Sequence, residues 1–212
     1  MIITLASLKG GSGKTSLAVH LAYVIALSKR KVLLVDADPQ ASAQSWAAAR
    51  EDKPPFTVVG MARNTLHRDL PDLMDSYDYA VIDTPPRVSA LARTAILAAD
   101  LVIIPVQPSS YDVWAAAETV ELLKEAQGFK PELKAVFVVN RVLSRTLISE
   151  DVVEALSEYE IPTLKSKITQ RVAFAESSAG FTVFETGSKK VAGKEIKDLS
   201  EEILNQLGIS RW

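Results

Sequence analysis

The sequence contains no cysteine, and this absence excludes disulfide bonds, cysteine-ligated zinc and iron–sulfur clusters. Its only histidines, His20 and His67, do not stand at a spacing typical of metal ligands. No apolar run approaches the roughly 18 residues of a membrane-spanning helix, and no basic segment followed by an apolar run opens the chain as a secretory signal would. We therefore expect a cytoplasmic protein.

The sequence also has little net charge. A formal charge of -2 excludes a generally basic nucleic-acid binder, so any affinity for DNA has to come from a local patch. The apolar fraction is high, at 48% of 212 residues, and predicts a well-packed globular core. Because neither internal repeats nor a linker-like change of composition is visible, we expect one domain over residues 1–212.

Short apolar runs alternate along the chain with segments of helical periodicity. The expected strands are the opening apolar run and residues 32–35, 56–59, 77–83, 100–106 and 133–141, with 161–164 starting the last strand. The expected helices cover residues 17–27, 42–52, 65–76, 90–98, 111–126, 148–159 and 195–207. Continuous Val/Leu runs are typical of strands that are buried on both faces. The pattern predicts an α/β fold with a mostly parallel β-sheet and helices on both faces.

The first strand leads into a glycine loop and then a helix, which is the arrangement of a phosphate-binding loop. Glycines let backbone N–H groups turn around phosphate oxygens, because a Cβ there would block the approach. Lys14 supplies a full positive charge for the β- and γ-phosphates, and the Thr15 hydroxyl is a suitable Mg²⁺ ligand. The predicted nucleotide-binding residues of this segment are Lys9, Gly10, Gly11, Ser12, Gly13, Lys14, Thr15 and Ser16.

The loop departs from the general pattern, since Leu8 stands where the first glycine is expected and Lys9 directly precedes the glycine pair. The run from Lys9 to Ser16 resembles the deviant Walker A motif of the ParA/MinD family of P-loop ATPases. The resemblance implies that Lys9 reaches across a nucleotide-dependent homodimer to the phosphates bound by the other subunit. It makes Lys9, Lys14 and Asp38 the catalytic candidates, with ATP and Mg²⁺ as cofactors.

Two aspartates, Asp36 and Asp38, follow the second strand within Asp-Ala-Asp-Pro-Gln. Ligands of parallel sheets collect at the carboxyl ends of strands, so both carboxylates are expected near the phosphate loop. In the family that it resembles, this segment is a switch whose second aspartate positions the attacking water, a role that falls to Asp38. Asp36 is a candidate for the magnesium shell, and a helix-capping or turn aspartate is the alternative reading.

Two later strands also end in polar residues. Asp83 follows an apolar run and precedes Thr-Pro-Pro, which resembles a Walker B strand whose carboxylate would hold Mg²⁺ opposite Thr15. Residues 87–89 would be a second switch that senses the γ-phosphate. Asn140 stands where family members often recognise adenine, although a turn-forming asparagine fits as well. Arg141 would flank the nucleotide or the dimer interface.

Residues 165–194 carry a local charge of +4, which contrasts with the chain as a whole. ParA-like proteins bind DNA non-specifically through basic residues in this part, and such contacts go to phosphates. A solvated lysine face is the competing interpretation. The candidate DNA-binding residues are Lys165, Lys167, Arg171, Lys189, Lys190 and Lys194.

The chain as a whole resembles a small ParA-type partition ATPase without an N-terminal DNA-binding domain. The resemblance implies an ATP-dependent homodimer on non-specific DNA that segregates or positions a plasmid, a chromosome or a large cellular body. A ParB-like or cargo-adaptor protein would stimulate hydrolysis, and the protein would associate with the nucleoid. A MinD-like membrane-associated ATPase and a metabolic ligase of the dethiobiotin synthetase type are the alternatives. The former needs a basic amphipathic tail, whereas residues 201–212 begin with two acids and contain one arginine.

Overall fold

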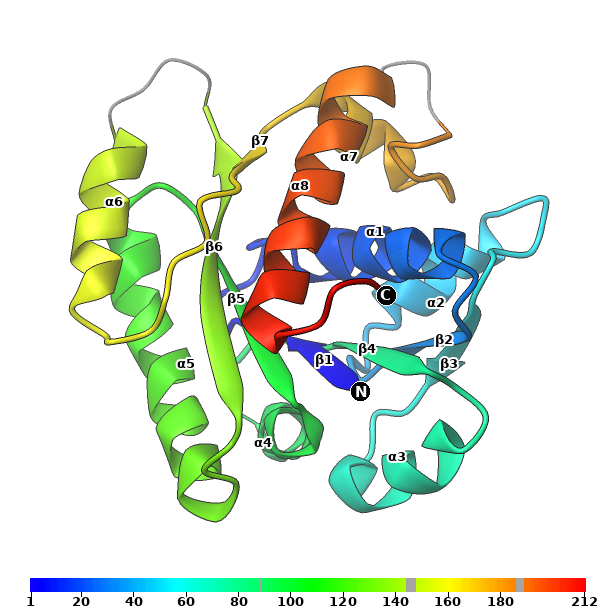
Figure 1. The fold of residues 1–212 in the computed structure, drawn as a ribbon, viewed down its shortest axis with the longest axis horizontal. Coiled ribbons are helices and arrows are strands. Elements are labelled where there is room, and N and C mark those ends of the chain that lie inside the picture. Colours follow the sequence, from blue (N-terminus) through cyan, green and yellow to red (C-terminus); the bar gives the residue numbers. More distant parts are fainter. Residues whose placement is uncertain (88, 144–147, 186–188) are drawn as a thin grey trace.

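The computed structural model describes residues 1–87, 89–143, 148–185 and 189–212, and all their side chains except those of residues 148–150 and 189. Within these residues seven strands form one sheet in the order β3-β2-β4-β1-β5-β6-β7, and each strand is parallel to its neighbours (Figure 1). The strands are β1 (Ile2–Leu5), β2 (Val32–Asp36), β3 (Thr57–Gly60), β4 (Tyr79–Asp83), β5 (Leu101–Val106), β6 (Lys134–Val142) and β7 (Ile168–Thr169). The helices are α1 (Lys14–Leu27), α2 (Ser42–Ala48), α3 (Leu66–Met74), α4 (Ala90–Ala98), α5 (Ser110–Phe129), α6 (Ile148–Ser157), α7 (Val172–Ser177) and α8 (Lys189–Leu207).

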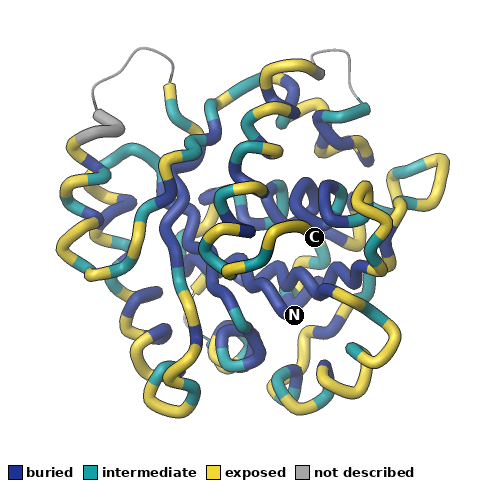
Figure 2. The backbone as a smooth tube through the Cα atoms, in the orientation of Figure 1, coloured by how far each residue is buried: buried dark blue, intermediate teal, exposed yellow. Residues whose placement is uncertain are grey.

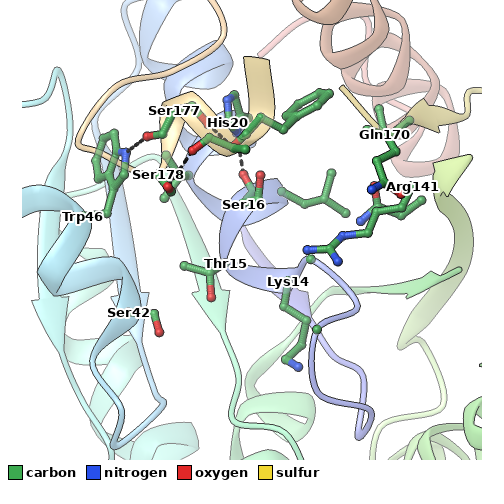
Figure 3. A pocket seen from close by; sticks show the side chains of 18 of the residues that line it. Lys14, Thr15, Ser16, His20, Ser42, Trp46, Arg141, Gln170, Ser177 and Ser178 are labelled. Atoms are coloured by element: carbon green, nitrogen blue, oxygen red, sulfur yellow. Dashed lines mark hydrogen bonds between the residues drawn. The ribbon is translucent and has the colours of Figure 1, made fainter. Parts of the chain in front are cut away.

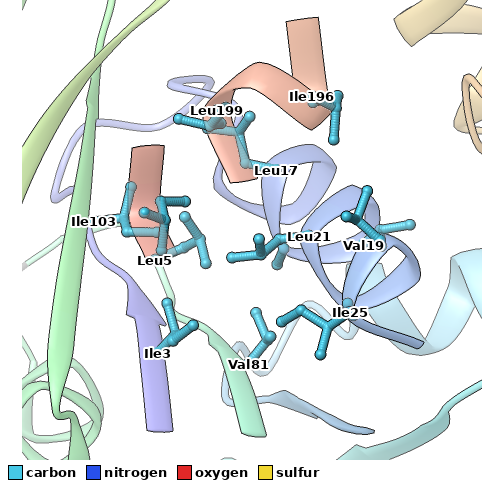
Figure 4. Close-up of a cluster of buried hydrophobic side chains, with 14 of the residues drawn as sticks. Ile3, Leu5, Leu17, Val19, Leu21, Ile25, Val81, Ile103, Ile196 and Leu199 are labelled. Atoms are coloured by element: carbon cyan, nitrogen blue, oxygen red, sulfur yellow. The ribbon is translucent and has the colours of Figure 1, made fainter. Parts of the chain in front are cut away.

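Helices cover both faces of the sheet, as the apolar runs predicted. On one face, Ile3 and Leu5 of β1 pack with Leu17 of α1 and Leu199 of α8, in a core to which α2 and α7 also contribute (Figure 4). On the other face, α3 and α4 cover one half of the sheet and α4, α5 and α6 the other half. The tube in Figure 2 is buried along the central strands and exposed on the outer sides of the helices. The α/β fold class is thus confirmed.

The predicted strand at residues 161–164 is wrong. Thr163 makes only an isolated bridge with Phe137, and the edge strand is β7, which pairs with β6 further along. Pro162 has no N–H to donate, so a regular ladder cannot run through this stretch. The chain instead brackets Phe137, whose N–H donates to Pro162 O and whose carbonyl accepts from Leu164 N–H.

Two helix boundaries also differ from the prediction. α8 begins at Lys189 and not at residue 195, because Ala192 extends the buried stripe of Ile196 and Leu199 by one turn. The helix expected over residues 42–52 ends at Ala48, where the chain turns towards the two prolines at 54 and 55. The other predicted boundaries agree to within about three residues.

The C-terminal segment folds back onto the body of the protein. Trp212 is 5% exposed, its ring meets the edge of Tyr79 on β4, and its indole N–H donates to Ser200 Oγ at 2.6 Å. Both termini lie near the start of β4, because the Met1 amino group donates to Asp78 O at 3.1 Å and Trp212 contacts Tyr79 (Figure 1). None of the helices in the described parts of the chain is both long enough and apolar enough to cross a membrane.

Candidate nucleotide-binding site

A cavity of about 740 Å³ opens where the parallel strands end, above β1, β4 and β6. The phosphate loop and the start of α1 form its floor. Its walls come from the segments after β2 and β4, from the end of β6, and from β7 with the chain that follows it into α7. Figure 3 shows that Lys14, Thr15 and Arg141 face this space, while Trp46 and Ser177 border its far side. Ligands of open parallel sheets bind at this carboxyl edge.

The loop before α1 has the backbone geometry that its glycines allow. Gly11 and Gly13 have φ angles of +77° and +93°, which side-chain-bearing residues rarely adopt. A Cβ on Gly13 would lie only 2.3 Å from Asn140 Nδ2, and that amide donates to Ser12 O at 2.7 Å. The Asn140 side chain therefore fixes the position of the loop backbone at Ser12 and Gly13. No side chain caps the N-terminus of α1, so its first N–H groups remain available to an anion.

Lys14 is a buried cation with few partners. Only 6% of it is exposed, and its ammonium group reaches Lys9 O at a long 3.4 Å. Burial lowers the pKa of Lys14, while the carboxylates of Asp83 and Asp38 act in the opposite direction. A buried ammonium in this position favours an anionic ligand such as a phosphate, and Ser12 Oγ, also buried and without a hydrogen-bond partner, is a further free donor.

Asp83 ends β4 beside Asp36 at the end of β2, since the two residues are register partners. Both carboxylate oxygens of Asp83 are buried and lack hydrogen-bond partners. Burial raises the pKa of Asp83 to about 7, and the neighbouring Thr15 hydroxyl opposes this shift. A divalent cation would satisfy these orphaned oxygens, so Thr15 and Asp83 fit a Mg²⁺ ion.

Asp36 and Asp38 occupy different environments. Asp36 is fully buried, and its two oxygens accept from Asp38 N–H at 3.2 Å and Gln44 N–H at 3.0 Å. It ties the switch segment to the start of α2, as the turn-aspartate alternative proposes. Asp38 lines the cavity and accepts from Gln40 N–H at 2.9 Å, which leaves its second oxygen for a ligand.

Lys9 points away from the cavity of its own chain. Its ammonium group forms an ion pair with Asp112 of α5 at 2.6 Å, and the Lys9 side chain remains 34% exposed. Asp112 is buried and also accepts from the Ser109 hydroxyl. Sequence reasoning missed Asp112: the Ser-x-x-Asp spacing signals a helix start but not a contact across 103 positions.

Arg141 is directed into the cavity by a local irregularity of β6. The register shifts between Asn140 and Val142, and Arg141 adopts a φ of +57° within this bulge. Asn140 Oδ1 accepts from the Arg141 N–H at 2.9 Å. Both residues line the cavity together with Gln170 and Phe174, which the sequence did not single out.

The six basic candidates for DNA binding differ in their surroundings and in their ion pairs. Arg171 lines the nucleotide cavity and forms an ion pair with Glu195 at 2.7 Å. Lys194 is exposed and pairs with Asp198 one turn further along α8. Neither charge is free for a phosphate without competition from its carboxylate.

The remaining candidates differ in exposure. Lys165 and Lys190 are exposed, and Lys167 is half-buried. The side chain of Lys189 lies outside the described residues, as does Val88 of the predicted second switch. Within the described part of the chain, the exposed candidate lysines therefore lie on α8 and on the segment after α6.

Comparisons with known proteins agree with this geometry. Residues 3–181 match the family described as CobQ/CobB/MinD/ParA nucleotide binding domain. The chain is 28% identical to the Maintenance of carboxysome distribution protein A of Halothiobacillus neapolitanus over 209 residues, covering 97% of this chain and 95% of that protein. It is 31% identical to the chromosome partitioning protein ParA of Myxococcus xanthus over 202 residues, covering 74% and 71%.

Solved structures show the same fold at lower identity. Apo McdA of Cyanothece superposes with a TM-score of 0.82 at 20% identity, over 95% of this chain and 98% of that one. The septum site-determining protein MinD of Pyrococcus horikoshii, complexed with Mg-ADP, gives a TM-score of 0.81 at 20% identity over 98% and 97%.

Proposed function

Because the chain belongs to the CobQ/CobB/MinD/ParA nucleotide-binding family, we propose that it is an ATP-driven positioning ATPase of the partition type. It binds ATP with Mg²⁺, closes into a homodimer, holds non-specific DNA and is released when a partner protein stimulates hydrolysis. The observation that carries this proposal is the different placement of two lysines of one loop. Lys14 is buried at the cavity, whereas Lys9 stands outside it, 34% exposed.

The residues of one subunit suffice to hold the nucleotide. The backbone N–H groups of the loop, the Lys14 ammonium group and the Ser12 hydroxyl would take the phosphates. Mg²⁺, held by Thr15 and Asp83, would supply positive charge to the phosphate oxygens. Arg141 and Asn140, at the bulge of β6, would border the nucleoside.

Hydrolysis requires an oriented water and a stabilised charge on the transferred phosphoryl group. Asp38 would orient the water through the carboxylate oxygen that Gln40 leaves free. Lys9 would act on the phosphates of the second subunit, in the manner of a trans-acting arginine finger. In the single chain Lys9 is engaged with Asp112, so dimer closure includes an exchange of this ion pair for a phosphate.

The proposal also covers the cargo and the protein surface that binds DNA. Relatives are named for carboxysome distribution and for chromosome partitioning, and we assign this chain to the same range of cargoes, reached through a ParB-like or adaptor protein. Lys165, Lys190 and Lys194 would contact DNA phosphates on the nucleoid. The buried Trp212 argues against the membrane alternative, since its ring packs on Tyr79 and is not free to enter a lipid surface.

The experiment that tests this function is the solution mass of the full chain without nucleotide, with Mg-ADP and with a slowly hydrolysed Mg-ATP analogue. We expect the 23.0 kDa monomer in the first two states and twice that mass in the third. Arg93→Gln, which removes an exposed ion pair with Glu125, serves as a control that dimerises normally. A chain that binds the ATP analogue and stays monomeric contradicts the proposal.

A further inference from the structure

The segment from residue 177 to residue 185, which runs from the end of α7 towards α8, is held by side chains of α2 and of the turn that follows it. The indole N–H of Trp46 donates to Ser177 O at 3.1 Å and to Phe181 O at 2.8 Å. Trp46 is 6% exposed, so these two carbonyls are its means of satisfying a buried donor. α2 follows directly after the Asp38 switch segment.

Arg50 makes the second set of contacts. Its guanidinium group donates to Gly180 O at 2.8 Å and to both carboxylate oxygens of Glu185, the shorter contact being 2.7 Å. It also lies 5.2 Å from the centre of the Trp46 ring. A Cβ on Gly180 would come within 2.9 Å of the Ala49 backbone, so the two backbones are in direct contact. We call Trp46 of α2 and Arg50 of the following turn together the Trp46–Arg50 clamp.

The clamped segment in turn contacts α8 and α1. Phe184 packs against Gly193 of α8, where an added Cβ would lie 3.2 Å from its ring, and Lys197 Nζ lies 5.9 Å from the ring centre. Phe184 also stacks on Tyr23 of α1 at 5.5 Å. A shift of the segment therefore changes the packing of α8.

The other end of α2 is attached to the switch. Gln44 N–H donates to Asp36 Oδ2 at 3.0 Å, and Ala41 precedes the helix in a left-handed conformation with φ of +54°. Ala41 itself has no side chain that could cap the helix, so the Asp36 carboxylate satisfies an N–H of its first turn. A non-glycine residue in this conformation is strained, and such strain collects at segments that change conformation with a ligand.

We propose that Trp46 and Arg50 are positioning residues that transmit the nucleotide state of the Asp38 switch to α8. α2 contacts the switch at Asp36 through Gln44 and the segment 177–185 through Trp46. If α2 moved away from that segment, the buried indole N–H of Trp46 would lose its acceptors, so α2 and the segment are expected to move together. The inference rests on the proposed function, in which Lys190 and Lys194 of α8 take part in binding DNA.

The test is amide hydrogen exchange of the full chain without nucleotide, with Mg-ADP and with a slowly hydrolysed Mg-ATP analogue. The proposal predicts that the ATP analogue changes exchange in residues 177–185 and in α8, beyond the change seen with ADP. Trp46→Phe and Arg50→Gln should confine the change to the phosphate loop and the switch. Arg93→Gln, which removes an exposed ion pair between α4 and Glu125 of α5, is the control that should respond as the wild type.

A second readout is the ratio of DNA affinities with ATP and with ADP. Coupling between sites typically amounts to a factor of about 5 to 150, so we expect the ratio to fall by about fivefold or more in Trp46→Phe. The wild type separates the two hypotheses: protection of the phosphate loop without any response in residues 177–185 overturns the relay alone. Absence of ATP-dependent protection in the phosphate loop overturns the proposed function itself.

Discussion

Lys9 and Lys14 are close in sequence but have opposite surroundings. Lys14 is buried near two carboxylates, and Lys9 is held outside the cavity by Asp112. The first position suits a residue that binds the phosphates of its own subunit, and the second suits one that acts on another subunit. The two lysines can therefore be separated by substitution.

We expect Lys14→Ala to lose ATP affinity, because no other described side chain places a cation at the floor of the cavity. Lys9→Ala should retain ATP binding and lose turnover, since the proposed function uses the Lys9 charge only in the closed dimer. Nucleotide titration and phosphate release measured on both variants check this. Normal stimulated turnover in Lys9→Ala would remove the trans-acting role.

His20 is a second residue whose environment has a measurable consequence, a dependence of stability on pH. It is 1% exposed; its Nδ1–H donates to Ser16 O at 2.6 Å and its Nε2 accepts from Val183 N–H at 3.0 Å. Burial lowers the pKa of His20 to about 4, against 6.5 for the free group. The unfolded chain therefore binds a proton at His20 between these values and the folded chain does not.

The contribution of His20 to the free energy of unfolding should rise with pH from about 4 to 6.5, by about 3 kcal/mol in all. Asp83, whose pKa is raised to about 7, acts with the opposite sign in the same window. Urea unfolding of wild type and His20→Gln at several pH values isolates the histidine, because Asp83 is common to both. Parallel pH profiles of the two proteins would contradict the assignment.

Among the secondary-structure elements, the junction of β1 and α1 depends most on its glycines. Gly13→Ala should abolish nucleotide binding, because its Cβ would collide with Asn140 Nδ2 and its φ of +93° is strained for alanine. Gly11→Ala is the matched control: its φ of +77° is also positive, but no atom lies within 4 Å of the added Cβ.

Titration with a fluorescent nucleotide, together with thermal melting, distinguishes the two glycines. Gly11→Ala should cost about 1–2 kcal/mol of backbone strain and leave the loop intact. Equal loss of nucleotide affinity in both variants would show that backbone conformation alone, and not the Asn140 contact, limits the site.

The alternation of strands and helices could be predicted because each buried strand carries a continuous apolar run and each helix an apolar stripe. The phosphate loop could be predicted because glycines, lysine and hydroxyl are adjacent in sequence. The strand expected at 161–164 failed since Pro162 interrupts the ladder, a constraint that the apolar pattern does not report.

Contacts between distant segments could not be predicted. The ion pair of Lys9 with Asp112 spans 103 positions, and that of Arg50 with Glu185 spans 135. No local signal distinguishes Arg50 from an exposed surface arginine, because its role depends on the path of the chain around Gly180. The same holds for Arg171, which was expected on a DNA surface and lies at the nucleotide cavity, paired with Glu195.

For the molecule as a whole, an overall charge of -2 means that the proposed DNA binding has to come from a local basic patch. Lys190 and Lys194 lie one turn apart at the start of α8. Reversing them in Lys190→Glu/Lys194→Glu should weaken DNA binding strongly and leave ATP binding unchanged. Filter binding and nucleotide titration on the same preparation check this, and unaltered DNA affinity would move the surface elsewhere.

The most direct measurement is binding of the wild-type chain to non-specific DNA with Mg-ATP, with Mg-ADP and without nucleotide, over a salt series. A positioning ATPase of this type predicts binding with ATP only, and an affinity that falls steeply as salt rises, because the contacts go to phosphates. Equal affinity in all three states, or no binding in any of them, would contradict the account.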